Sequence, residues 1–256
     1  MIPTISIVAP AYNEEAVLPL LCRTLFSVID QIPTYTFEII IVDNGSTDQT
    51  LSVLFNERNH DKRIKIIQLV RNVGVDHGML AGLTYAHGDA SIVMNADLQD
   101  NPKLISRFLK KWEAGYDMVY AIIRSRKGVS QAYQLFIRAL YKALHILTIG
   151  KVPENVSDYR LLDRSVYVKI VEHRHRYVFF RVIAALQSHN SIGIPYDRPM
   201  RLYGTSKMNI SQYIADIRNA IVTLIVHELP PIHTTTPEPT RSLFPVTRTW
   251  GFTKHI

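Results

Sequence analysis

The sequence has a single cysteine among 256 residues, and this scarcity excludes a disulfide bond within the chain. We therefore expect a reducing compartment. That cysteine, Cys22, falls on the apolar side of a predicted helix, where a lone thiol packs rather than reacts. No apolar run approaches the roughly 18 residues of a membrane span, since Ala220–Val226 is too short. The first residues also lack the basic region and apolar stretch of a signal peptide, so we expect a cytoplasmic chain that does not cross a bilayer.

Negative charge is also scarce, because the formal net charge is +7. A basic protein favours acidic partners such as phosphates, nucleic acid or an anionic membrane surface. No basic run with interleaved aromatic residues is present, so we predict no nucleic-acid partner. The apolar fraction of 47% and the length fit one large globular domain with a substantial core.

Apolar runs alternate with helical patterns through the first half of the chain. Strands are predicted over 5–9, 37–42, 64–70, 91–95 and 117–123, with helices over 14–30, 48–59, 78–87 and 102–114. This alternation predicts an α/β fold with a mostly parallel sheet flanked by helices. The continuously apolar strand Ile39–Val42 agrees, because such strands are covered on both faces.

The regular alternation of predicted strands and helices ends at about residue 127. We expect a long amphipathic helix over 129–149, a polar turn or short strand over 157–164, one or two helices over 164–186, a strand over 191–196 and a basic loop to 207. The predicted organisation is a main domain over 1–208, an amphipathic helix over 209–229 and a tail over 230–256. The tail is rich in Pro and Thr, which predicts disorder.

Each of the first four predicted strands ends in a polar cluster. These clusters are Pro-Ala-Tyr-Asn-Glu at 10–14, Asp-Asn-Gly-Ser-Thr-Asp at 43–48, Arg-Asn-Val-Gly at 71–74 and Asn-Ala-Asp at 95–97. Because the carboxyl ends of parallel strands meet at one edge of a sheet, the clusters are expected to line a single ligand site.

The fourth cluster carries the side chains that suit a metal ion. Asp97, Gln99 and Asp100 offer the hard oxygen ligands that Mg²⁺ or Mn²⁺ takes when it carries a phosphorylated substrate. The alternative is an acidic turn in which Asp100 and Asn101 cap the following helix. The neighbouring polar clusters favour the metal site.

Together with Ser157–Arg164 (Ser-Asp-Tyr-Arg-Leu-Leu-Asp-Arg) and Arg201–Lys207 (Arg-Leu-Tyr-Gly-Thr-Ser-Lys), these clusters resemble the ordered motifs of family 2 glycosyltransferases with the Rossmann-like GT-A fold. The sequence is most similar to the polyprenyl-phosphate branch, which contains dolichol-phosphate mannose synthases and bactoprenol glucosyltransferases. The resemblance covers about residues 4–220 and implies that 1–208 is a GT-A catalytic domain.

The resemblance implies a role for particular residues. Those expected to line the nucleotide pocket are Pro10, Tyr12, Glu14, Asp43, Asn95 and Ala96. Asp97 and Gln99 would bind Mg²⁺ or Mn²⁺, and Arg71 would hold phosphate or orient Asp97. The alternatives are a turn-forming Asp43 before Asn44 and a solvated Arg71. Family members usually have Asp where this chain has Asn95, which removes one negative charge from the site.

The implied reaction moves a hexose, glucose or mannose, from a nucleotide-diphosphate sugar to undecaprenyl or dolichyl phosphate, with inversion at the anomeric carbon. Asp97 and Asp158 would be the catalytic residues, with Asp158 orienting or deprotonating the acceptor; the alternative for Asp158 is a turn cap. The acceptor phosphate is expected to meet Arg126, Arg138, Arg201, Ser206 and Lys207.

We expect peripheral binding to the inner membrane face through the helices over 129–149 and 209–229. The alternative is that both helices pack on the sheet. Two other functions stay open: transfer to a glycan acceptor, and a non-catalytic protein that binds nucleotide sugars. A homo-oligomer is also compatible with the sequence.

Overall fold

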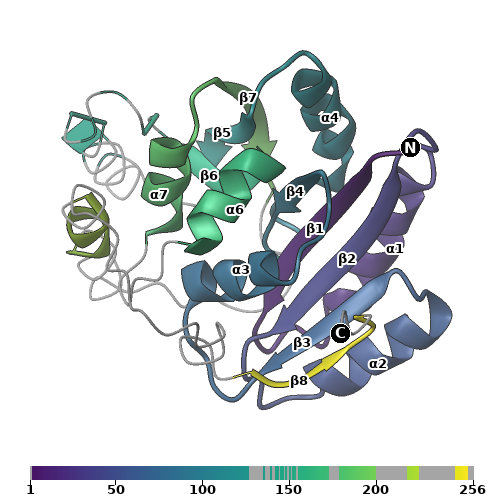
Figure 1. Ribbon diagram of the computed structural model, residues 1–256. Coiled ribbons are helices and arrows are strands. Elements are labelled where there is room, and N and C mark those ends of the chain that lie inside the picture. The colour runs from purple at the N-terminus through teal and green to yellow at the C-terminus, as the bar shows by residue number, and fades with distance from the viewer. Residues whose placement is uncertain are drawn as a thin grey trace.

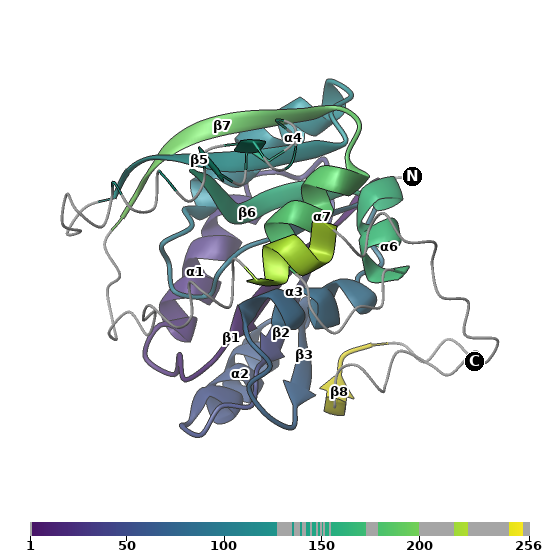
Figure 2. The same ribbon diagram turned by 90° about the vertical axis from the view of Figure 1, so that its left-hand side faces the viewer.

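The computed structural model describes residues 2–126, 135, 139, 142–143, 145–146, 148, 150, 152–153, 155–172, 179–199, 218–224 and 246–252. In this part of the chain, eight strands form one sheet with helices on both faces (Figures 1 and 2). The predicted α/β architecture is therefore confirmed.

The first half of the chain alternates strands and helices as the sequence predicts. The elements are β1 (Thr4–Ala11), α1 (Leu18–Ile29), β2 (Thr36–Asp43), α2 (Thr50–His60), β3 (Ile64–Leu69), α3 (Val75–Thr84) and β4 (Ala90–Val93). Strands β4, β1, β2 and β3 lie side by side and run parallel. Their carboxyl ends therefore share one edge of the sheet, which we call the rim.

The later elements extend the sheet on both sides. They are a short 3₁₀ turn η1 (Pro102–Leu104), α4 (Ile105–Glu113), β5 (Met118–Arg126), β6 (Val156–Asp163), α6 (Arg164–Glu172), α7 (Phe180–Gln187), β7 (Ser191–Arg198) and β8 (Val246–Trp250). The strand order is β7-β5-β6-β4-β1-β2-β3-β8. Strand β6 runs antiparallel to its neighbours β4 and β5, and β8 runs antiparallel to β3, so the sheet is mostly parallel.

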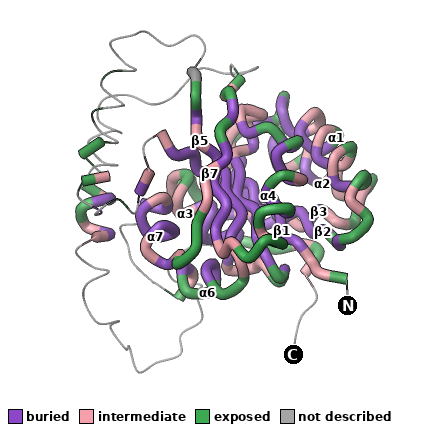
Figure 3. The backbone as a smooth tube through the Cα atoms, turned by 90° about the horizontal axis from the view of Figure 1, so that it is seen from above, coloured by how far each residue is buried: buried purple, intermediate pink, exposed green. Residues whose placement is uncertain are grey.

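Two apolar cores cover the two faces of the sheet. The strands between them are largely buried (Figure 3). Alternate residues of β1 divide between them, since Ile5 and Ile7 face α1 and α4 while Val8 faces α3. Burial of both faces explains the continuously apolar strands. Cys22 is fully buried on α1, and burial, with Glu57 and Asp61, raises the pKa of its thiol to about 12, so the thiol packs as predicted.

The polar segment after residue 156 is a strand, one of the two alternatives expected from the sequence, but it is longer and more buried than predicted. Residues 157–164 were expected to form a polar turn or short strand, yet β6 spans eight residues and is buried through Leu162. Pairing with β4 and β5 satisfies its backbone. Its polar side chains are buried because they bind one another and side chains of neighbouring elements.

The predicted disorder of the tail is wrong for residues 246–250, which form β8 on the outer edge of β3. The ring of Trp250 packs edge-on against that of Phe55, with 4.7 Å between the ring centroids. The rings of Phe252 and Tyr85 also pack together, with 5.1 Å between their centroids. β-Branched and aromatic residues favour strands, and an unpaired edge offers backbone partners. The other tail residues lie outside the described ranges, apart from 251–252.

The two helices expected to contact a membrane are only partly described. Residues 142–143 and 145–146 are helical, while most of 129–149 lies outside the described residues. In the helix at 218–224, Ala220 is buried and Thr223 Oγ1 accepts a hydrogen bond of 3.0 Å from the Phe179 amide. This segment therefore packs on the core. None of the helical segments that can be described is both long and apolar enough to span a bilayer.

A buried carboxylate braces the end of the sheet opposite the rim. Glu38, 6% exposed, accepts hydrogen bonds from Ser6 Oγ (2.5 Å) and the His87 amide (2.8 Å) and pairs with Lys65. Burial opposes its ionisation, but Lys65 and Ser6 outweigh burial and lower the pKa of Glu38 below its ordinary value.

We expect Glu38→Gln to destabilise the fold by about 1.5–3 kcal/mol at pH 7, the usual contribution of hydrogen bonds to a charged group. A lowered folded-state pKa stabilises the protein above the unfolded pKa of about 4.3. The difference between wild type and variant should therefore shrink as the pH falls below about 4 and through the folded-state pKa. Urea denaturation at pH 7 and at acidic pH measures it, and a pH-independent difference contradicts the assignment.

Candidate active site

The four polar clusters lie together at the rim. Ala11 is in register with Asp43 at the ends of β1 and β2, and the Asn44 amide donates to the Ala11 carbonyl at 2.8 Å. On the other side of β1, the Met94 amide donates to the Val8 carbonyl at 3.0 Å, which starts the fourth cluster beside the first. Asp43 and the 95–97 loop are thus on the same edge, separated by one strand, as the sequence predicts.

Hydrogen bonds lock the first cluster to the second. Asn13 has a left-handed backbone (φ 55°), and its amide donates to Ser46 Oγ at 3.0 Å while its Oδ1 accepts from the Thr47 amide at 2.8 Å. The Glu14 amide donates to Thr50 Oγ1 at 2.9 Å. These contacts hold the chain in a turn, so α1 begins at Leu18 rather than near residue 14.

The predicted nucleotide residues of these two clusters are placed close together. Tyr12 is partly exposed, whereas Pro10 and Glu14 are buried. Asp43 is 1% exposed, and its Oδ1 accepts the Ser46 amide at 3.0 Å. Asp43 therefore forms the turn that the alternative interpretation describes, and its contact with a nucleotide stays a prediction.

Asn44 joins the second cluster to the third. Its Nδ2 donates to the Gly74 carbonyl and its Oδ1 accepts the Val73 amide, both at 3.0 Å. Gly45 has φ +70°, and a Cβ there would lie 2.4 Å from the carbonyl carbon of Arg71. The side chain of Arg71 is exposed, as the solvated alternative states.

We expect Gly45→Ala to destabilise the protein more than Gly115→Ala. Both residues have positive φ, which costs a Cβ-bearing residue roughly 1–2 kcal/mol, but Gly115 has open space around it. The clash at Gly45 adds about 1–3 kcal/mol because the obstacle is backbone. Equal unfolding free energies of the two variants in urea would contradict this packing.

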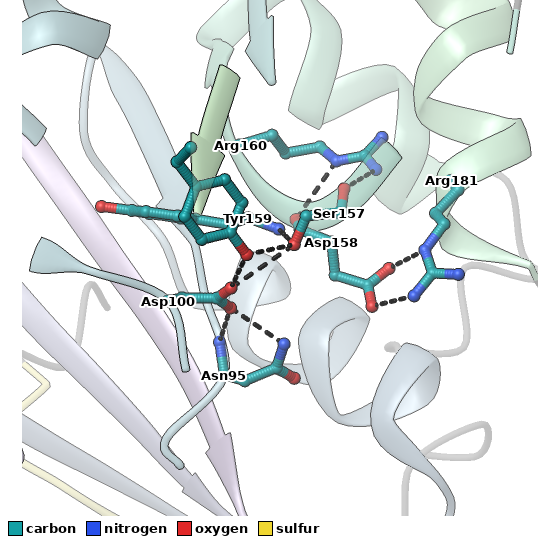
Figure 4. Close-up of polar contacts among 8 residues, drawn as sticks. Asn95, Asp100, Ser157, Asp158, Tyr159, Arg160 and Arg181 are labelled. Carbon is teal, nitrogen blue, oxygen red and sulfur yellow. Dashed lines mark hydrogen bonds and ion pairs between the residues drawn. The ribbon is translucent and has the colours of Figure 1, made fainter. Parts of the chain in front are cut away.

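Asp100 holds the fourth cluster in place through buried hydrogen bonds. It is fully buried, and its Oδ2 accepts both the backbone amide and Nδ2 of Asn95 at 2.9 Å. Its Oδ1 accepts Tyr196 OH at 3.0 Å. The same oxygen accepts Ser157 Oγ at 3.4 Å (Figure 4). Both carboxylate oxygens of Asp100 are occupied by protein donors. Asp100 therefore holds the loop in place, and it does not act as the metal ligand that the sequence analysis offered.

Asn95 and Ala96 have more restricted roles than the sequence analysis assigned. The side-chain Nδ2 of Asn95 donates to Asp100, a hydrogen bond that an ionised Asp at this position could not donate. Ala96 is 2% exposed and packs in the core below α1 and α4. Contact of Asn95 or Ala96 with a nucleotide stays a prediction.

Asp97 and Gln99 form a donor set that fits a hard divalent ion. Both are partly exposed at the rim. Asp97 Oδ1 accepts the Gln99 amide at 3.1 Å, and Gln99 Nε2 donates to the Pro199 carbonyl at 3.3 Å. A carboxylate and an amide oxygen suit Mg²⁺ or Mn²⁺, which bind few protein ligands when substrate phosphates and waters complete the shell. Within the described ranges, no three His, Cys, Asp or Glu residues cluster as a metal site.

Asp158 lies at the rim in a network of arginines (Figure 4). Because Val93 of β4 pairs with Arg160 of β6, the start of β6 lies beside the 95–97 loop. Asp158 is 6% exposed and accepts two hydrogen bonds from Arg181 on α7, from Nε at 2.6 Å and from Nη2 at 2.5 Å. Asp158 is therefore in a strand and ion-paired, not a turn cap.

Arg160 is the second arginine of this network. It is 1% exposed, and its Nε and Nη2 donate to the carbonyls of Asp158 (3.2 Å) and Ser157 (2.8 Å), while its guanidinium lies 5.3 Å from the Phe180 ring centroid. Burial opposes ionisation of Asp158, but Arg181, with Arg160 and Arg198, lowers its pKa below the ordinary value. A carboxylate with a lowered pKa is a poor proton acceptor, so the contacts favour an orienting role for Asp158.

The expected acceptor-binding residues are largely untested. The backbone of Arg126 ends β5 at the rim, and its side chain lies outside the described part, as do Arg138, Arg201, Ser206 and Lys207. The neighbouring Arg124 is exposed and pairs with Asp197 of β7 at 3.4 Å.

Sequence reasoning missed two arginines of this site, Arg181 and Arg198. Arg181 lies in a helical pattern that gives no sign of its partner on β6. Arg198 ends β7, whereas the predicted strand stopped at Tyr196. The alternation of Tyr196 and Arg198 on one face of a longer strand is the signal that could have found it.

The family comparison defines the class of protein. The model of the family described as Glycosyl transferase family 2 matches residues 6–171. The chain belongs to glycosyl transferase family 2.

Curated relatives match most of this chain. A Shigella phage SfX protein named bactoprenol glucosyl transferase is 32% identical over 205 residues, which are 80% of this chain and 67% of that protein. An uncharacterized glycosyltransferase of Synechocystis, sll0501, is 39% identical over 205 residues, 80% of this chain and 64% of that protein. The chain thus spans about two-thirds of the length of these relatives.

Solved structures share the fold. Glucosyl-3-phosphoglycerate synthase from Mycobacterium tuberculosis, in complex with Mn²⁺, UDP-glucose and phosphoglyceric acid, has a TM-score of 0.59 at 18% identity, covering 88% of this chain and 79% of that one. S. aureus TarS, in complex with UDP-GlcNAc, has a TM-score of 0.58 at 18% identity, covering 90% and 69%. The fold is therefore the GT-A glycosyltransferase fold.

Proposed function

We propose that this protein transfers a hexose, glucose or mannose, from a nucleotide-diphosphate sugar to a polyprenyl phosphate, undecaprenyl or dolichyl, with inversion at the anomeric carbon. The observation that carries the proposal is the convergence of four polar loops at one rim, where Asp43 and the 95–97 loop lie on the same edge of the sheet, one strand apart. The relatives named bactoprenol glucosyl transferase support a polyprenyl-phosphate acceptor. Solved relatives in complex with UDP-sugars support a nucleotide-sugar donor.

The rim residues divide into a donor side and an acceptor side. On the donor side, Pro10, Tyr12, Glu14 and Asp43 would hold the nucleotide, because a carboxylate accepts hydrogen bonds from a base or ribose. A Mg²⁺ or Mn²⁺ ion held by Asp97 and Gln99 would neutralise the charge that develops on the departing diphosphate.

The acceptor phosphate is already ionised near neutral pH, so a general base is not required. One of its oxygens forms the new bond to the anomeric carbon while the bond to the diphosphate breaks, and the electron pair leaves with the diphosphate. Asp158 keeps Arg181 in place, and Arg126, Arg138, Arg201, Ser206 and Lys207 would receive the acceptor phosphate. Guanidinium groups suit this role because they bind phosphate through two N–H groups.

A position at the inner membrane face follows from the acceptor. Leu135 and Ile146 are exposed by 70% and 67%, and both belong to the segment 129–149 expected to lie on a membrane. Exposed large apolar side chains in a segment rich in basic residues favour contact with an anionic lipid surface.

Incubation with labelled UDP- and GDP-sugars, Mn²⁺ and either undecaprenyl or dolichyl phosphate tests the proposal. The expected product is a lipid-linked sugar whose anomeric configuration, measured by NMR, is opposite to that of the donor. Transfer to a glycan but not to lipid phosphate would contradict the acceptor assignment. Nucleotide-sugar binding without transfer to any acceptor would identify a non-catalytic binder.

A further inference from the structure

We propose that Arg198 binds the diphosphate of the nucleotide sugar, as a cation that works beside the metal ligand Asp97. This inference rests on the proposed function, because it assigns a further residue to the donor side of the same site. Arg198 ends β7, and the backbone hydrogen-bonding register pairs it with Arg126 at the end of β5.

Contacts of its neighbours place Arg198 beside the fourth cluster. Tyr196, two residues earlier, reaches Asp100 with its hydroxyl at 3.0 Å. Side chains two apart on a strand share a face, so Arg198 projects on the side of Asp100 but closer to the rim. On the other side, the Pro199 carbonyl accepts Gln99 Nε2 at 3.3 Å. The end of β7 thus contacts Asp100, which holds the fourth cluster in place, and Gln99, a predicted metal ligand.

Among the residues that the structure describes, none accepts a hydrogen bond from one donor of the Arg198 guanidinium. Its Nε is buried and makes no hydrogen bond within the described part of the protein, although the side chain as a whole is partly exposed. Buried polar atoms are normally paired, and exceptions call for an explanation such as an absent ligand. An N–H of a cation that lacks an acceptor is suited to an anion.

The surroundings keep Arg198 charged and define which anion fits. Burial opposes the charge of Arg198, but the carboxylates of Asp100, Asp97 and Asp158 and the hydroxyl of Tyr196 raise its pKa. Asp100 and Asp158 already accept hydrogen bonds from other residues. Asp97 is the predicted ligand of the ion that would carry the diphosphate, so the unused donor of Arg198 would be available to a phosphate bound there.

NMR of the Arg198 side chain in the wild-type protein tests the contact without disturbing the fold. The Nε–H signal is assigned through the side-chain carbons to the backbone and followed on addition of UDP with Mg²⁺, GDP with Mg²⁺, or a short isoprenyl monophosphate. We expect a shift with one of the two nucleotides. A shift with the isoprenyl phosphate alone places Arg198 on the acceptor and overturns the donor assignment, and no shift with any of them in a protein that transfers sugar overturns the proposal.

Kinetics of Arg198→Lys give a second readout, because Lys keeps the charge but lacks the Nε donor. We expect the KM for the nucleotide sugar to rise roughly 10–100-fold, the loss of one charged hydrogen bond, with an unchanged KM for the lipid phosphate. The matched control is Arg107→Lys, at an exposed position on α4. An unchanged donor KM contradicts the proposal, whereas failure of the wild type to transfer any sugar instead refutes the proposed function.

Discussion

Asp97→Asn is expected to lower the rate of sugar transfer by about 10²–10³-fold, the order found when one group that stabilises developing charge is removed. Asn keeps an oxygen that can accept the Gln99 amide, so the loop should retain its conformation. What is lost is the negative charge that attracts a divalent ion. Initial rates with saturating donor and lipid phosphate measure the effect.

The matched control for this variant is Asp30→Asn. Asp30 lies after α1 at the edge of the sheet opposite the rim, and its ion pair with Arg63 is exposed, so its loss changes little. Both variants should unfold within about 1 kcal/mol of the wild type in urea. Full activity of Asp97→Asn in a Mn²⁺-dependent enzyme would refute the metal assignment.

Asp158→Ala is expected to destabilise the protein by about 3–5 kcal/mol, because removing one partner of a buried ion pair leaves the other charge without compensation. Arg181 loses both of its hydrogen bonds to the carboxylate, and the buried Arg160 loses a nearby negative charge. Urea denaturation at pH 7 measures the change. This result would assign Asp158 to the framework that positions the arginines.

A double-mutant cycle with Arg181→Ala separates this role from a catalytic one. The two losses should not add, and a coupling of about 0.5–3 kcal/mol is expected for residues in contact. The control is Asp197→Ala, since the side chain of Asp197 is 58% exposed and its pair with Arg124 should contribute at most about 1 kcal/mol. Wild-type stability in Asp158→Ala together with lost activity would instead support a catalytic Asp158.

The alternation of strands and helices along the chain, and the rim, could be predicted because their signals are local. Apolar runs, helical periods and polar clusters each occupy a few consecutive residues, and parallel alternation then fixes where the clusters meet. The metal-ligand candidates Asp97 and Gln99 were found in this way. The motif order also sufficed to place the chain in its family.

The features that were missed depend on contacts between distant segments. β8 pairs with β3 although most of the tail has a composition typical of disorder. Asp158 and Arg181 meet across β6 and α7, and Asp100 gains its donors from β6 and β7 as well as from its own loop. No local pattern marks such partners, so the sequence offered Asp100 as a further metal ligand or a helix cap and left Arg181 and Arg198 without a role.

A crystal structure with Mn²⁺ and the nucleoside diphosphate that binds, UDP or GDP, tests the central claim most directly. We predict the base against the 10–14 and 43–48 loops, with Mn²⁺ joining the diphosphate to a carboxylate oxygen of Asp97. An ion held without Asp97, or a nucleotide bound away from the carboxyl ends of β1, β2 and β4, would contradict the account.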